Sequence, residues 1–184
     1  SLSLPQLVAQ MMVVRTTGHL FDHEIEYPAW EATQAQMEHY ITGLGVGGVI
    51  LLGGSGAEVA LRAQTLQAMA DIPLLIAADI EEGVGQRFSG ATWFPPPMAL
   101  GEIARNDLPL AKTYAHQFGH HTANEAIAVG LNWILAPGVD VNNNPANPVI
   151  NVRAFGETPE IVTQLTQAFI QGAQDYPILT TAKH

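Results

Sequence analysis

Three charged residues, Asp79, Asp140 and Lys183, each stand at the end of an apolar run of the sequence. If these runs are parallel strands, the three side chains meet at the carboxyl edge of a sheet, where α/β proteins bind ligands. A carboxylate there can accept hydrogen bonds from vicinal hydroxyls, and an ammonium group can donate to a polar substrate. Two alternatives stay open. Asp79 could cap a helix or order a loop, and Lys183 could form a Schiff base if burial kept its amine neutral.

Arg153 is the next candidate, because it is one of only seven Lys and Arg residues and lies just beyond an apolar stretch. Its planar guanidinium can donate to hydroxyl or carboxylate oxygens. The Asn- and Pro-rich segment before it, 142–148, is typical of an ordered loop. Among the tryptophans, Trp133 lies within a predicted strand and is expected in the core, whereas Trp93 beside three prolines could line a sugar site.

Three histidines of one predicted helix are candidate metal ligands. His116 and His120 share a helix face at spacing i, i+4, with His121 beside them. A metal site needs a third ligand, and Gln117 stands where a zinc protease carries its glutamate. We therefore expect solvated or core-edge histidines and predict no metal. The glycines match neither the dinucleotide-binding nor the P-loop pattern, so no cofactor is expected.

Composition excludes several classes of protein. The 184 residues are 47% hydrophobic and 13% charged, which is too apolar for a disordered chain. The net charge of −10 argues against binding to nucleic acid or to an anionic membrane. No cysteine is present, which excludes thiolate metal sites and cysteine nucleophiles, and this absence slightly favours the cytoplasm. The longest apolar runs are strand-sized, so no segment is expected to span a bilayer.

The elements that would position these residues alternate along the chain. Apolar runs predict strands at 45–52, 73–79, 131–140 and 177–182, and a further strand at 11–14 competes with a helix over 7–15. Helices are predicted at 57–70, at 108–130 and after Thr158, which is a cap residue followed by Pro159. Open doubly wound sheets and (βα)8 barrels both fit this alternation. The polar strand ends favour the TIM-type barrel, of which this length holds the first four to five βα units.

With these residues assembled, the sequence resembles the N-terminal barrel domain of glycoside hydrolase family 3. The matching segments occur in the family's order over nearly the whole chain, and together they are specific although each alone is weak. They are 47–51, 79–88, 131–137 with Asp140-Val141, 147–150 running into Arg153-Ala154-Phe155-Gly156, and 182–184. Glu81 and the Gln86-Arg87-Phe88 segment resemble the β-N-acetylglucosaminidase branch more than the plant and fungal β-glucosidase branch. Ile80, Glu82 and Val84 depart from that branch's pattern.

The resemblance implies a set of substrate-binding residues. Asp79 would bind hydroxyls of the non-reducing sugar, and Arg153, Lys183 and His184 would complete that subsite. Arg87 would belong to its glucosaminidase version. In the family, an Asp nucleophile and a His acid/base follow the Lys-His pair, so none of the present residues is assigned a catalytic role. We expect residues 1–184 to be the N-terminal part of the barrel domain, incomplete at the C-terminus, with the remaining strands supplied by further sequence.

The function implied by the resemblance is that of an exo-acting retaining glycosidase. It would hydrolyse terminal β-linked N-acetylglucosamine (N-acetylhexosamine) without metal or cofactor, with a carbohydrate substrate as its partner and neither nucleic acid nor membrane. The alternatives are a β-glucosidase of the same family, a non-catalytic sugar-binding fragment, and a Schiff-base lyase that uses Lys183.

Overall fold

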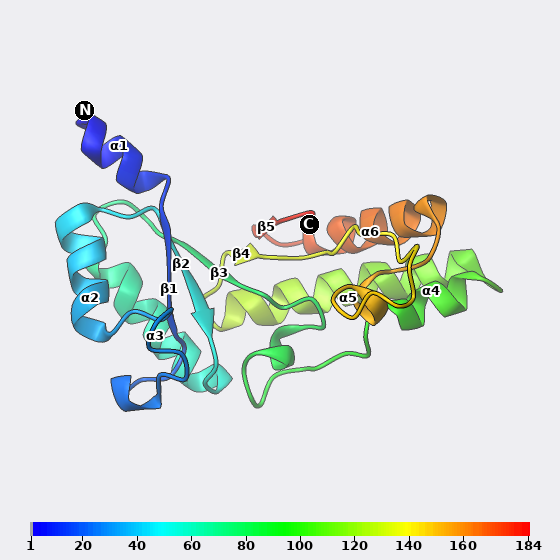
Figure 1. Ribbon diagram of the computed structural model, residues 1–184, viewed down its shortest axis with the longest axis horizontal. Helices are drawn as coiled ribbons and strands as arrows, with labels where there is room; N and C mark the ends of the chain where they lie inside the picture. The colour runs from blue at the N-terminus through cyan, green and yellow to red at the C-terminus, as the bar shows by residue number, and fades with distance from the viewer. Residues whose placement is uncertain (1) are drawn as a thin grey trace.

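The computed structural model describes residues 2–184, and its centre is one parallel sheet of five short strands (Figure 1). The strands are β1 (Val13–Thr17), β2 (Gly48–Leu52), β3 (Leu75–Ala78), β4 (Trp133–Ile134) and β5 (Leu179–Thr180). Their order in the sheet is β1-β2-β3-β4-β5, the same as their order along the chain. A doubly wound sheet reverses its strand order part-way, whereas a (βα)8 barrel adds strands in sequence. The fold is therefore part of a TIM-type barrel, as predicted.

Helical segments follow each of the first four strands. β1 leads through the 3-10 helix η1 (Asp22–Glu24) into α2 (Gln34–Glu38) and the π-helix η2 (His39–Leu44), and β2 leads into α3 (Gly56–Met69). The 3-10 helix η3 (Val84–Gln86), α4 (Met98–Ala104) and α5 (Leu108–Ala128) follow β3; η4 (Asn151–Arg153, 3-10) and α6 (Pro159–Ala173) follow β4. Within residues 2–184, no helix combines the length and apolarity needed to cross a membrane.

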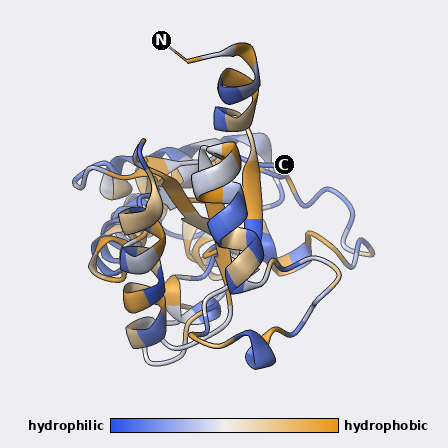
Figure 2. Ribbon diagram, turned by 90° about the vertical axis from the view of Figure 1, so that its left-hand side faces the viewer, coloured by the Kyte–Doolittle hydropathy of each residue, from blue (hydrophilic) through white to orange (hydrophobic). Residues whose placement is uncertain are grey.

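The first helix, α1 (Leu4–Gln10), stands apart from the rest. It projects from the body of the molecule in both views (Figures 1 and 2), and none of its residues is buried. The sequence left a helix and a strand as alternatives over 7–15, and the structure contains both in succession: α1 ends at Gln10 and β1 begins at Val13.

Helix ends and close helix packing follow from local sequence. The Thr158 side chain accepts a hydrogen bond from the Ile161 backbone at the start of α6, and Ser55 forms a capping box with Glu58 at the start of α3. α5 and α6 pack against each other at glycines, where a Cβ on Gly119 or Gly172 would overlap the backbone of the facing helix. This contact helps to bury the aromatic part of the core.

Strand β4 is shorter than predicted. Within the run 131–140 only Trp133 and Ile134 belong to β4, although backbone hydrogen bonds to the neighbouring strands extend from Asn132 to Ala136; Pro137, which lacks a backbone N–H, lies just beyond them. Trp133 is half-buried rather than in the core, and its Nε1 donates to Thr181 Oγ1 at 2.6 Å. The indole therefore joins β4 to the end of β5, beside the residues of the candidate site.

Candidate functional site

The carboxyl ends of β3 and β5 bring Asp79 and Lys183 into contact, although 104 residues separate them. Lys183 Nζ lies 2.6 Å from Asp79 Oδ1 and 2.7 Å from Glu81 Oε1. The backbone of Lys183 is held by the segment after β4: its N–H donates to the Pro137 carbonyl, and its carbonyl accepts from the Val139 N–H. The ammonium group is therefore fixed between two carboxylates.

Glu81 links the two cations of this cluster. Arg153 Nε and Nη2 donate to its two carboxylate oxygens at 2.9 and 2.8 Å, while Lys183 approaches Oε1. The Glu81 side chain is only 5% exposed. Burial by itself would raise the pKa of Glu81, but hydrogen bonds from Arg153 and Lys183 and their positive charges lower it to about 2. Glu81 is therefore ionised at neutral pH and cannot act as a proton donor.

His184 and Asp140 extend the cluster beyond Arg153. Arg153 Nη2 lies 3.1 Å from His184 Nε2, and His184 Nδ1 lies 2.8 Å from Asp140 Oδ2. A guanidinium can only donate, so Nε2 accepts and Nδ1 carries the proton that Asp140 accepts. The geometry thus selects one neutral tautomer of His184 and aligns the ring with the cluster.

Arg87 reaches the cluster through the loop that follows β3. Its Nε donates to the backbone carbonyl of Asp79 at 2.9 Å, which holds the exposed Arg87 side chain against the backbone of that residue. The loop turns at Gly83, whose φ of 91° favours glycine and whose added Cβ would clash with Phe94. Two of the residues that depart from the family pattern, Ile80 and Val84, are fully buried within this loop, which is why apolar side chains are compatible with its conformation. The third, Glu82, accepts a hydrogen bond from Trp93 Nε1 at 2.7 Å.

This arrangement can bind a ligand rich in hydroxyl groups. The Asp79 side chain is 34% exposed and that of His184 is 44% exposed, so acceptors and donors alternate along an accessible rim. Each carboxylate of the rim has a partner in the cluster: Lys183 contacts Asp79, Arg153 contacts Glu81, and His184 contacts Asp140.

All five predicted binding residues, Asp79, Arg87, Arg153, Lys183 and His184, lie in this one cluster or directly beside it. Sequence reasoning did not include Glu81 or Asp140 in the set. The spacing of Asp79 and Glu81 was a usable signal for the first, because residues i and i+2 of an extended chain point to the same side. The helix histidines lie elsewhere, with His120 paired to Asp175 at 2.8 Å.

Residues 3–184 match the sequence profile of the glycosyl hydrolase family 3 N terminal domain. The chain belongs to this family.

Three similar proteins illustrate the range within glycosyl hydrolase family 3. A protein of Cellulomonas fimi named beta-N-acetylglucosaminidase/beta-glucosidase is 34% identical over 79% of this chain and 25% of its own length. A beta-hexosaminidase of Nitrosomonas eutropha is 34% identical over 84% of this chain and 44% of its own. A solved family 3 beta-N-acetylglucosaminidase from Paenibacillus sp. is 34% identical with a TM-score of 0.82, covering all of this chain and 33% of that one. The chain thus spans a quarter to under half of these relatives.

Within this family 3 chain, the surroundings of Lys183 favour one of its two predicted roles. Its Nζ is paired with both Asp79 and Glu81. Two carboxylates at hydrogen-bond distance suit an ammonium donor, whereas a Schiff base requires the neutral amine. The geometry therefore favours hydrogen bonding to a polar ligand over covalent chemistry.

Proposed function

We propose that the protein is an exo-acting retaining glycosidase that removes terminal β-linked N-acetylglucosamine (N-acetylhexosamine). One observation carries the proposal: Asp79, Lys183, Glu81, Arg153 and His184 form a continuous cluster of ion pairs and hydrogen bonds at the carboxyl ends of the strands. That edge is where (βα)8 enzymes bind their substrates. The beta-hexosaminidase and beta-N-acetylglucosaminidase names of the relatives support the substrate class.

In this proposal, the cluster holds the non-reducing sugar. Asp79 accepts hydrogen bonds from two neighbouring hydroxyls through its exposed carboxylate. Lys183 has three N–H donors; two face Asp79 and Glu81, and the third serves a sugar oxygen. Glu81 makes no sugar contact. It keeps Lys183 and Arg153 in place, so that little conformational entropy is lost in orienting them when the sugar binds.

Arg87 is the residue that we propose gives the site its preference for N-acetylglucosamine. Its exposed guanidinium lies beside Asp79 and can donate to an acetamido oxygen as well as to a hydroxyl. The second candidate function is that of a β-glucosidase, which the double name of the Cellulomonas relative favours.

We further propose that these residues form the N-terminal part of a longer barrel domain, and that the nucleophile and the acid/base come from its remainder. The relatives are two to four times longer than the matched part, which supports this arrangement. A retaining mechanism needs a nucleophile and an acid/base on either side of the scissile bond. The carboxylates of the cluster are instead paired with other side chains: Asp79 and Glu81 with Lys183 and Arg153, and Asp140 with the His184 N–H.

The direct test is to measure kcat/KM of the protein for an aryl β-N-acetylglucosaminide and for the matching aryl β-glucoside. The proposal expects the higher value for the N-acetylglucosaminide. An equal or higher value for the glucoside would favour the second candidate. No hydrolysis of either by the full-length protein would refute the glycosidase proposal.

A further inference from the structure

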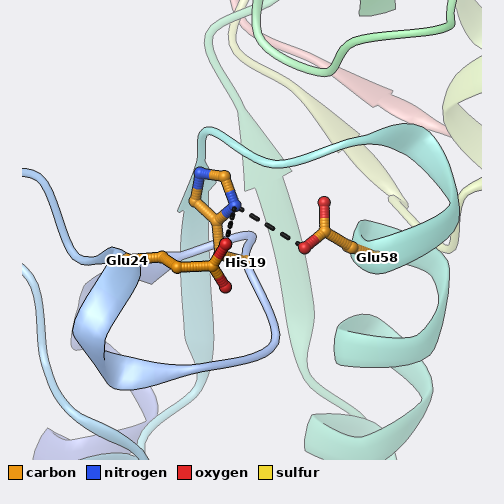
Figure 3. A group of neighbouring side chains, drawn as sticks. All are labelled: His19, Glu24 and Glu58. Carbon is orange, nitrogen blue, oxygen red and sulfur yellow. Dashed lines mark ion pairs between the residues drawn. The ribbon is translucent and has the colours of Figure 1, made fainter.

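A second cluster of metal-ligating side chains lies at the ends of β1 and β2, outside the sugar cluster. His19 follows β1, Glu24 ends η1, and Glu58 lies in the first turn of α3. Figure 3 shows one imidazole nitrogen facing both carboxylates, and one ligand atom from each residue lies within 4.8 Å of the others. The three residues come from segments up to 39 positions apart, which is why sequence spacing did not reveal them.

The distances within this cluster are too long for hydrogen-bonded ion pairs. His19 Nδ1 lies 3.7 Å from Glu24 Oε1 and 3.6 Å from Glu58 Oε1. The same chain contains two His–carboxylate pairs that close to 2.8 Å, at His120 and His184. Three ligands that hold one ion at about 2.1 Å lie roughly 3.4–3.6 Å apart. The spacing around His19 matches that of ligands around an ion.

Unpartnered polar atoms point to a missing partner. Within residues 2–184, His19 Nδ1 and Glu24 Oε2 are both buried atoms that make no hydrogen bond. Buried polar atoms are normally satisfied, so each needs an explanation. A cation bound by these residues would supply the partner that His19 Nδ1 lacks and would draw the Glu24 carboxylate to itself.

Glu58 is held ready to act as a ligand. Its Oε2 accepts hydrogen bonds from the Ser55 backbone N–H and from Ser55 Oγ, both at 2.8 Å, which leaves Oε1 directed at His19. Hydrogen bonds from Ser55 lower the pKa of Glu58, so its carboxylate is ionised. A helix cap thus fixes one carboxylate oxygen and orients the other, as a supporting shell does for a metal ligand.

The ligand atoms are of the types that bind a divalent metal ion, and the cluster is accessible from a cavity. A cavity of about 260 Å³ adjoins the cluster, and Glu24, Glu26 and Glu31 line it against Arg15 and Arg87. Imidazole nitrogen with two carboxylate oxygens suits first-row divalent metals, whereas calcium and magnesium prefer oxygen ligands alone. We propose that His19, Glu24 and Glu58 bind one first-row divalent metal ion, such as Zn²⁺.

The proposed site differs in role from the sugar cluster. The ion would join the loop after β1 to the first turn of α3, on the same rim of the sheet as Arg87, which lines the adjoining cavity. Its function would be to order that loop beside the sugar subsite. The metal contributes no step to the proposed hydrolysis.

The test is isothermal titration of EDTA-dialysed full-length protein with ZnCl2 at pH 7.5. We expect one Zn²⁺ per protein, and at least tenfold weaker binding in His19→Ala and in Glu58→Gln. Glutamine can still form the Ser55 capping box, so Glu58→Gln removes the ligand charge while keeping the helix start. His23→Ala is the matched control, because this exposed histidine lies in the same loop and outside the cluster; it should bind as the wild type does.

A second readout separates the site from surface binding. Excess Zn²⁺ should raise the Tm of the wild type and of His23→Ala by several degrees, and should raise that of His19→Ala clearly less. The proposal fails if the wild type binds no Zn²⁺, if His19→Ala binds it as tightly, or if Ca²⁺ binds as tightly as Zn²⁺.

Discussion

Glu81 is the residue on which the site's geometry depends, since its carboxylate holds Arg153 and Lys183 at once. Glu81→Gln leaves both cations facing a neutral group, and removal of one partner from a buried ion pair is strongly destabilising. We expect kcat/KM to fall at least tenfold. Glu102→Gln, on the exposed face of α4, is the matched control and should keep full activity.

The acid stability of the protein provides a second prediction about Glu81. Its folded pKa of about 2 is below the ordinary value of 4.5, so its contribution to folding is fully present above pH 4.5 and is lost as the pH falls toward 2. At neutral pH this contribution is about 3 kcal/mol. Urea unfolding of wild type and Glu81→Gln should therefore show a difference in unfolding free energy that shrinks between pH 4.5 and 2. A difference that stays constant over this range would contradict the ion-pair assignment.

At the scale of elements, the turn after β3 positions Glu81 and Arg87. Gly83 and Gly90 both have positive φ, but a Cβ at Gly83 would lie 2.7 Å from Phe94 and from the Thr92 carbonyl, whereas Gly90 faces open space. Gly90→Ala should cost about 1 kcal/mol for backbone strain alone. Gly83→Ala should cost about 2–3 kcal/mol more, because overpacking adds to the strain, and should also lower kcat/KM. Equal effects of the two substitutions on urea unfolding would show that the close packing at Gly83 is unimportant.

The elements also show how far the sequence could be interpreted. Continuous apolar runs and cap residues predicted β2, β3, α3 and α5 close to their observed ends, and predicted the start of α6. Local signals could not predict the length of β4, because regular strand pairing ends at Ile134 although the run stays apolar through Val139, and only the isolated bridge between Gly138 and Lys183 follows Pro137. Asp79 and Lys183 could be chosen because each follows a strand end, and Arg153 because it follows an apolar stretch, although that stretch leads into η4 and forms no strand. The role of Glu81 could not be predicted in this way, because its partner Arg153 is 72 residues away and only the folded sheet brings the two side chains together.

At the scale of the whole molecule, β1 and β5 form the two ends of the five-stranded sheet. In a closed barrel these two strands would pair with further strands. Consistent with our proposal that the catalytic pair lies in the remainder of the domain, we expect residues 1–184 expressed alone to give no turnover of an activated aryl β-N-acetylglucosaminide. Hydrolysis clearly above the buffer rate, abolished by substitution of a carboxylate within residues 1–184, would show that the catalytic groups lie in this part of the domain.

The central claim is that the ion-paired cluster binds the sugar, and the most direct test compares two aspartates at opposite ends of β3. Asp79 follows the strand and carries the proposed sugar contacts, whereas the exposed Asp71 precedes it. Hydrogen bonds to a charged group contribute about 1.5–3 kcal/mol each, so the loss of two should lower kcat/KM about 100-fold or more. We predict this loss for Asp79→Asn in the full-length protein with thermal unfolding still cooperative, and no loss for Asp71→Asn. Asp79→Asn activity within twofold of wild type would contradict the account.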